Sequence, residues 1–185
     1  MHLRRDHSIG IVVDVQEKLF PYIHDHDRFA AATSRLVRGL KILGVPVLAV
    51  QLYTKGLGET VAPLRELLLD CPLFEKISFS CCGDPSILRA LKLSGRRCVI
   101  VAGVESHACV LQTTLDLLVE GFLPVVVEDC VSSQRQVDKQ VAIQRMRQEG
   151  ARITTSESIL FELLERAGTE TFRQISRLVK EAGRE

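Results

Sequence analysis

Short apolar runs rich in β-branched residues alternate along this chain with segments whose apolar residues recur every three or four positions. Runs of the first kind are typical of buried strands, and segments of the second kind are typical of amphipathic helices. We expect strands at residues 8–15, 45–52, 73–77, 99–101, 124–128 and 152–154. Because right-handed crossovers place helices on both faces of a parallel sheet, this alternation predicts a six-stranded, doubly wound (Rossmann-like) α/β fold with three α/β/α layers.

The bulk composition argues against several classes of protein. At 185 residues the chain has the length of one domain, and we expect a single domain over residues 1–185. Its 24 Lys and Arg residues balance 23 Asp and Glu residues, so the net charge is only +1. This balance provides no basic surface for nucleic acid or for an anionic membrane, and we expect neither as a partner. We expect a small-molecule substrate and a homo-oligomer.

The start of the chain, MHLRRDHS, lacks the apolar core of a signal peptide, and no apolar run approaches the roughly 18 residues of a membrane span. We therefore expect an intracellular, cytoplasmic protein. In that compartment the six cysteines are expected to be free thiols. None of them lies in a C-x-x-C pair, which argues against a structural zinc site.

Three residues with chemically useful side chains follow three different predicted strands. Asp14 follows the first strand, Lys76 lies near the end of the third and Cys109 follows the fourth. Since the carboxyl ends of parallel strands meet at one edge of the sheet, all three are delivered to the rim where α/β sheets bind ligands. Each has a structural alternative: Asp14 as a turn or cap residue, Lys76 as a side chain that reaches solvent, Cys109 as a small buried residue.

The segment 98–121 joins a β-branched run to an apolar helical pattern almost without a loop. Ser106 is a suitable N-cap, and it would place Cys109 at about the third position of the helix. Unpaired backbone N–H groups and the positive end of the helix dipole lie there, so a thiol at that position is expected to ionise more easily. We interpret Cys109 as a candidate nucleophile.

A nucleophilic thiol needs a proton acceptor, which is most often a histidine. His107 is two residues from the candidate nucleophile on the same helix and points away from it, and the two histidines before the first strand lie at the opposite end of the sheet. His24 and His26 follow the first strand and stay open as alternatives. A carboxylate with a raised pKa can also accept the proton while an ammonium group stabilises the thiolate, so Asp14 and Lys76 form a chemically sufficient set.

Three motifs resemble those of one known family. The segment 103–109, GVESHAC, resembles the G-[IV]-x-[TS]-x-x-C signature of the isochorismatase-like cysteine hydrolases. Asp14 in VDVQ resembles the D-x-Q motif on the first strand of that family, and Lys76 in FEK matches its third catalytic residue. The resemblance covers residues 9–158, and the segments 55–58 and 132–150 are most similar to the isochorismatase domain-containing proteins, which have no assigned substrate.

The resemblance implies a set of catalytic roles. Cys109 is the implied nucleophile, Asp14 the base that activates it and Lys76 the electrostatic partner of both. A cis peptide bond between Val104 and Glu105 is also implied, with the backbone N–H groups of Glu105 and Cys109 forming an oxyanion hole.

Two departures from the family limit this transfer. Nicotinamidases of the superfamily bind a metal through an Asp-x-His after the second strand, whereas this chain has Gln51-Leu52-Tyr53, so we expect no metal and no cofactor. True isochorismate hydrolases carry Asp at the nucleophile position, so Cys109 argues against vinyl-ether chemistry.

Taken together, the motifs predict a cysteine-dependent hydrolase of a small amide or related C–N bond, which acts through a thioester on Cys109. Two alternatives stay open. The chain could be a catalytically idle binding or assembly protein of the same family, or a thiol redox protein that uses Cys109 or the adjacent Cys81 and Cys82.

Overall fold

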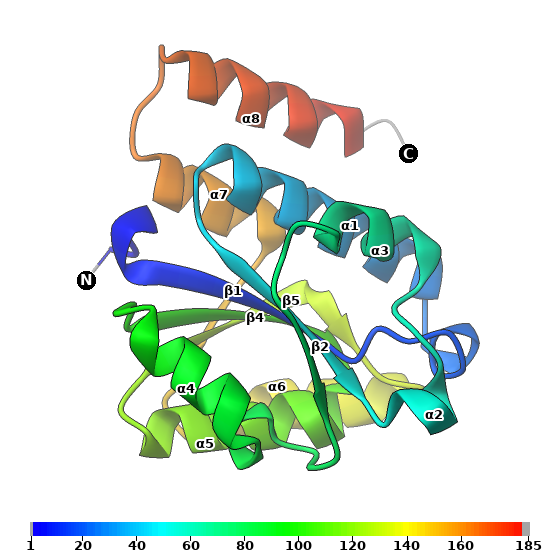
Figure 1. The fold of residues 1–185 in the computed structure, drawn as a ribbon. Helices are drawn as coiled ribbons and strands as arrows, with labels where there is room; N and C mark the ends of the chain where they lie inside the picture. Colours follow the sequence, from blue (N-terminus) through cyan, green and yellow to red (C-terminus); the bar gives the residue numbers. More distant parts are fainter. Residues whose placement is uncertain (1, 183–185) are drawn as a thin grey trace.

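The computed structural model describes residues 2–182 and contains one six-stranded parallel sheet (Figure 1). The strands lie in the order β3-β2-β1-β4-β5-β6, and each neighbouring pair is parallel. Their bounds are β1 (Ser8–Val13), β2 (Val47–Leu52), β3 (Leu73–Lys76), β4 (Cys98–Val104), β5 (Leu123–Ser132) and β6 (Arg152–Thr154). The predicted doubly wound α/β fold is therefore confirmed.

Helices cover both faces of the sheet, as the crossover rule requires (Figure 1). One face carries α1 (His26–Ile42), α3 (Ala62–Leu68) and α7 (Ser156–Leu164), and the other carries α4 (Pro85–Leu93), α5 (Leu111–Val119) and α6 (Gln136–Gln148). The short α2 (Thr54–Leu57) follows β2 at the rim. The last helix, α8 (Glu170–Ala182), packs on the outside of α1 and α7. A separate apolar cluster fills the space on each side of the sheet.

The two central strands, β1 and β4, are buried along their whole length. Strand order runs outward from β1 through β2 to β3, and then restarts beside β1 with β4. The connections therefore reverse direction between β1 and β4, and this switch point is where doubly wound sheets open a crevice for ligands. Asp14 follows β1 and the Cys109 turn follows β4, so both lie at the switch point.

Strand β5 is longer than the expected 124–128, because it continues to Ser132. The apolar run that predicts this strand ends at Glu128, because the next residue, Asp129, is polar. In the structure, the pairing of β4 with β5 shifts register near this point, and the strand then resumes against Gly103 and Val104. Asp129 contacts the start of the distant helix α7, where its Oδ1 accepts a hydrogen bond of 2.7 Å from the Ser156 N–H.

Gly103, near the end of β4, is required by close backbone packing. Its φ is +126°, and an added Cβ would lie 2.0 Å from the carbonyl oxygen of Val13 on the neighbouring strand. Backbone atoms within a buried sheet cannot move aside as a flexible side chain can. The glycine therefore sets the spacing of β1 and β4 immediately before Asp14.

We predict that Gly103→Ala lowers the free energy of unfolding by about 2–4 kcal/mol, through the clash added to positive-φ strain. Denaturant titration measures the change. Gly150→Ala is the matched control, because Gly150 also has a positive φ of +107° but no atom lies within 4 Å of its added Cβ. It should cost about 1–2 kcal/mol, from strain alone. Equal losses in the two variants would show that the contact with Val13 does not matter.

Candidate active site

The structure brings Asp14 and Lys76 into direct contact. Lys76 Nζ lies 2.7 Å from Asp14 Oδ2, and both side chains are 0% exposed. Because β2 lies between the strands that carry them, the long lysine side chain must reach across that strand to meet the carboxylate. Lys76 Nζ also donates a 3.0 Å hydrogen bond to the carbonyl oxygen of Phe79. Lys76 is therefore paired with the Asp14 carboxylate, and its ammonium group does not reach solvent.

Asp14 occupies an unusual backbone position and is fully buried. Its φ is +54°, in the left-handed region that few non-glycine residues adopt. Its second carboxylate oxygen, Oδ1, is buried and accepts no hydrogen bond of ordinary geometry from the described residues. Burial raises the pKa of Asp14, while the Lys76 charge and hydrogen bonds with Cys109 and Lys76 oppose the rise. A carboxylate with a raised pKa is a better proton acceptor than an exposed one.

Cys109 is 4% exposed and lies beside this carboxylate. It belongs to a π-helical turn, Ser106–Val110, that continues into α5. Burial raises the pKa of the Cys109 thiol, the negative charge of Asp14 raises it further, and the Lys76 charge lowers it. The expectation of an easily ionised thiol is therefore wrong, because burial and the carboxylate outweigh the helix start. The thiol is protonated at rest and needs a proton acceptor in order to react.

The expected N-cap role of Ser106 is also wrong. The N-cap position is occupied by Glu105, which makes no side-chain cap hydrogen bond. Ser106 instead donates a 2.9 Å hydrogen bond from Oγ to the carbonyl oxygen of Ser132 at the end of β5. A buried serine just before a helical pattern looks like a cap in sequence, but here it ties the Cys109 turn to the neighbouring strand.

The peptide bond between Val104 and Glu105 is cis, as the resemblance implied. The carbonyl oxygen of Glu105 accepts hydrogen bonds from the N–H groups of Ala108 and Val110, which closes the turn around Cys109. The Glu105 side chain lies on the outer side of this turn, where Oε1 accepts a 3.2 Å hydrogen bond from the Gln134 N–H. An oxyanion hole formed by Glu105 and Cys109 stays a prediction.

His24, His26 and His107 make contacts away from Cys109. His107 Nδ1 lies 3.0 Å from Ser133 Oγ, and His26 Nδ1 lies 2.9 Å from Asp27 Oδ1. His24 contributes backbone groups, since its N–H donates to the Ser133 carbonyl oxygen and its carbonyl oxygen accepts from Ser132 Oγ. Among the residues that the structure describes, none of these histidines forms a hydrogen bond or ion pair with Cys109. The histidine alternatives for the base gain no support.

Sequence reasoning missed the role of Gln16, although it lies in the D-x-Q motif. Its side chain is fully buried and makes three hydrogen bonds. Oε1 accepts from the Leu52 N–H at 2.7 Å, and Nε2 donates to the carbonyl oxygens of Leu52 at 3.0 Å and Gly58 at 2.7 Å. Gln16 thus satisfies backbone groups at the end of β2, as a neighbouring strand would. It also holds the loop that follows β2 in place at the rim.

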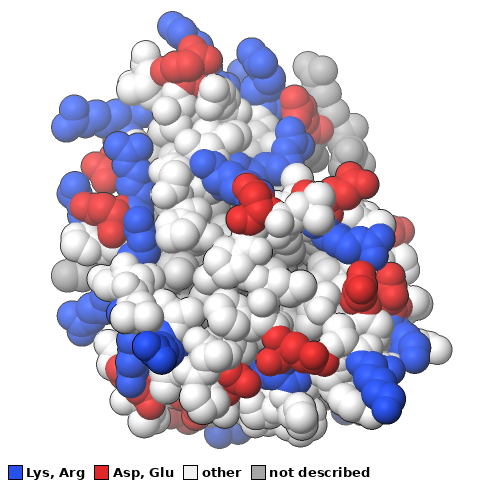
Figure 2. Space-filling model, in the orientation of Figure 1, with Lys and Arg blue, Asp and Glu red and all other residues white. Residues whose placement is uncertain are grey.

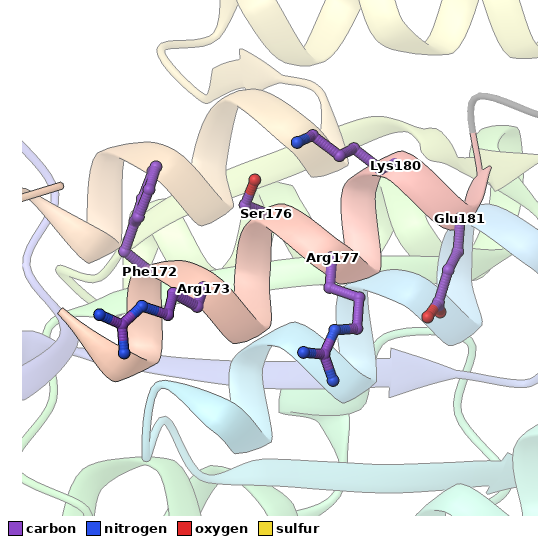
Figure 3. Close-up of a pocket in the computed structure, with 6 residues that line it drawn as sticks. All are labelled: Phe172, Arg173, Ser176, Arg177, Lys180 and Glu181. Carbon is purple, nitrogen blue, oxygen red and sulfur yellow. The ribbon is translucent and has the colours of Figure 1, made fainter. Parts of the chain in front are cut away.

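Two hollows lie away from these three residues. One, of about 500 Å³, is lined by side chains of α8 alone, including Phe172 and Arg177 (Figure 3). The other, of about 1110 Å³, lies between α1, the end of β5 and α6, and its lining includes Arg35, Asp129 and Lys139. Neither is lined by Asp14, Lys76 or Cys109.

Charged side chains of both signs are spread over the face of the molecule drawn in Figure 2. Lys and Arg residues are intermixed with Asp and Glu around an uncharged central area on the face drawn in Figure 2. Within the described part of the chain, no three His, Cys, Asp or Glu side chains gather so as to hold a metal ion. No helix among residues 2–182 is long and apolar enough to cross a membrane.

Fold and site together define an α/β protein with an Asp, a Lys and a Cys at the switch point of a doubly wound sheet. The isochorismatase domain family matches residues 8–158 of the chain. The chain therefore belongs to the isochorismatase family, and the resemblance seen in the motifs is confirmed. Membership in this family supports a hydrolase.

Two named relatives match most of the chain. The secreted isochorismatase effector Isc1 of Phytophthora sojae is 38% identical, over 94% of this chain and 85% of the relative. The isochorismatase domain-containing protein 2A of Mus musculus is 36% identical, over 94% of this chain and 83% of the relative.

Solved structures share the fold. A structure described as the MAR1 ribonuclease of Caenorhabditis elegans is 36% identical, covers 97% of this chain and 93% of its own, and has a TM-score of 0.92. The YcaC gene product of Escherichia coli, described as an octameric hydrolase of unknown specificity, is 22% identical with a TM-score of 0.88, over 98% of this chain and 89% of its own. At that identity the second likeness concerns the fold alone.

Proposed function

We propose that this protein is a cysteine-dependent hydrolase of a small amide or related C–N bond. The observation that carries the proposal is the buried Asp14–Lys76 ion pair beside the Cys109 thiol. A buried ion pair contributes little to stability on balance, so its presence at the ligand rim favours a functional reason for it.

In the proposed reaction, Cys109 Sγ attacks the carbonyl carbon of the substrate while its proton passes to Asp14. The tetrahedral intermediate collapses to a thioester, and the leaving nitrogen takes the proton from Asp14, so ammonia or an amine departs. A water molecule then attacks the thioester, with Asp14 again accepting a proton and returning it to the Cys109 sulfur. Lys76 positions the carboxylate through their ion pair and offsets the negative charge that develops on sulfur.

The negative oxygen of each tetrahedral intermediate needs hydrogen-bond donors. We assign this role to the backbone N–H groups of Glu105 and Cys109, the first after β4 and the second in the π-helical turn. Preorganised backbone donors cost no reorganisation during the reaction, which makes them effective in a buried site.

The remaining proposals concern the whole protein. We propose that residues 1–185 form a single isochorismatase-like hydrolase domain, that the substrate is a small molecule, and that catalysis uses no metal and no cofactor. We also propose a homo-oligomer and an intracellular location. The Phytophthora sojae relative is named as a secreted effector, so location is to be tested directly.

The proposal predicts Cys109-dependent release of ammonia or an amine from a panel of small amides, ureides and carbamoyl compounds. At least one compound should be hydrolysed by the wild type, and Cys109→Ala should lose this activity by about 10³-fold or more, because the nucleophile is gone. Chelator in the same assay should leave turnover unchanged. A chelator-sensitive activity that zinc or iron restores would contradict the metal-free mechanism.

The name of the nematode structure suggests a second assay. RNA incubated with the wild type and with Cys109→Ala should stay uncut in both, since a buried thiol paired with a carboxylate suits acyl transfer. RNA cleavage that both preparations show equally would point to an activity outside this site. If Cys109 is silent toward every thiol probe and substrate, the idle binding or assembly protein becomes the better description.

A further inference from the structure

A second thiol, Cys81, lies on the inner side of the segment that follows β3. It begins a short 3-10 turn (Cys81–Gly83), is 0% exposed and belongs to the same buried cluster as Cys109. Its backbone N–H donates a 2.9 Å hydrogen bond to Thr113 Oγ1. Thr113 is about one helical turn beyond Cys109, on the same side of the helix. Cys81 is therefore held against α5, about one turn beyond Cys109.

Cys81 interacts electrostatically with the charged residues of the candidate active site. The Lys76 charge lowers the pKa of the Cys81 thiol and the Asp14 charge raises it. Cys81 in turn raises the pKa of the Cys109 thiol. The adjacent Cys82 is different, because it is only partly buried and interacts with Asp116 and Glu120 instead. Of the two neighbouring thiols, Cys81 is the fully buried one, and it is the one that interacts with the charges of the site.

We propose that Cys81 is a resolving thiol for Cys109, which closes a Cys81–Cys109 disulfide when a peroxide oxidises Cys109. In the first step, the Cys109 thiolate attacks one oxygen of the peroxide and forms the sulfenic acid. The other oxygen leaves as hydroxide and takes the proton held by Asp14, which gives water. In the second step, Cys81 attacks the Cys109 sulfur, the S–O bond breaks, and the Cys81 proton passes through Asp14 to the leaving hydroxide. The products are one disulfide and a second water molecule.

The environment of Cys81 suits a resolving thiol better than a primary target. Burial raises the pKa of both thiols, but the Cys109 thiol interacts by hydrogen bond with Asp14, the proton acceptor, whereas the Cys81 thiol does so with Thr113. Peroxide is therefore expected to react first at Cys109. The sulfenic acid on Cys109 would then react with its neighbour before a second peroxide molecule arrives. The disulfide blocks the nucleophile reversibly, whereas the sulfinic acid blocks it permanently.

This inference rests on the proposed reactivity of Cys109 and requires no particular substrate. The test uses the reduced full-length protein, Cys81→Ala, and Cys82→Ser as the matched control. Each is treated with a few molar equivalents of hydrogen peroxide at neutral pH, blocked with N-ethylmaleimide and mapped as peptides without reduction. In wild type and Cys82→Ser, Cys81 and Cys109 should be joined in a cross-linked peptide, about 2 Da lighter at these two residues than their reduced forms, which dithiothreitol separates. In Cys81→Ala, the Cys109 residue should be about 32 Da heavier than its reduced form, because it carries a sulfinic acid that dithiothreitol does not reverse.

The wild-type peptide map shows whether Cys81 forms a disulfide with Cys109 even if Cys81→Ala does not fold. Sulfinic acid on Cys109 without a bridge, or a bridge from Cys109 to Cys82, would overturn the role of Cys81 and leave the proposed hydrolase intact. If neither peroxide nor an alkylating reagent modifies Cys109, then the inference and the proposed function both fail.

Discussion

Asp14→Asn is expected to lower the rate of Cys109 acylation by about 10² to 10⁴, the usual contribution of a positioned general base. The amide has the same shape as the carboxylate, and its oxygen can still accept a hydrogen bond from Lys76 Nζ, now 2.7 Å from Asp14 Oδ2. It cannot accept the proton of Cys109, whose pKa is raised by burial. Single-turnover acylation with a substrate found in the amide screen measures the loss.

The pH profile of the wild type provides an independent readout of the same role. Only the ionised carboxylate accepts a proton, and burial raises the pKa of Asp14. Acylation should therefore fall as the pH drops through this raised pKa, at a higher pH than the value near 3.9 of an ordinary aspartate. Because the three groups are coupled, the profile reports on the set rather than on one residue.

Structural damage is separated from loss of the base by near-UV circular dichroism of Asp14→Asn, which should match the wild type. If the folded variant acylates at nearly the wild-type rate, Asp14 is only a turn residue. The base would then have to be sought at His24 or His26.

The sequence was sufficient for the fold and for the gathering of Asp14, Lys76 and Cys109 at one rim. Both follow from local patterns, because β-branched runs and helical spacing define the parallel sheet, and a parallel sheet delivers the ends of its strands to one edge. The switch point between β1 and β4 then follows from the order of the strands.

The features that sequence reasoning missed depend on partners far away along the chain. Ser106 has the local pattern of a cap, yet its hydroxyl group bonds to Ser132, 26 residues further on. The direction of the Cys109 pKa shift depends on burial and on Asp14, neither of which is visible in the segment around Cys109. The full burial of Cys81 rather than Cys82 is likewise set by packing against α5.

Lys76→Met is expected to lower the free energy of unfolding by about 3–5 kcal/mol at neutral pH, the usual cost of removing one partner of a buried ion pair. Methionine fills most of the space of the lysine stem, so the loss comes mainly from the charge. Asp14 is left fully buried without its counter-ion, which raises the pKa of its carboxyl group above the already raised wild-type value. Denaturant titration against pH measures the effect.

The pH dependence of this loss has a definite sign. A carboxyl group whose pKa is higher in the folded state than in the unfolded state binds its proton more tightly when folded, so stability falls as the pH rises from the unfolded pKa to the folded pKa. The variant should therefore be closest to the wild type near pH 4, where its Asp14 is protonated, and furthest from it at neutral pH and above.

The double variant Asp14→Asn/Lys76→Met distinguishes charge from packing. It removes both charges, and it should recover most of the stability that Lys76→Met loses, since a buried pair replaced by neutral groups of similar volume costs little. Neither variant should hydrolyse amides at the wild-type rate. If the double variant is as unstable as Lys76→Met at every pH, the lysine stabilises the protein by filling space, and the electrostatic role assigned to it in activating Cys109 loses its physical basis.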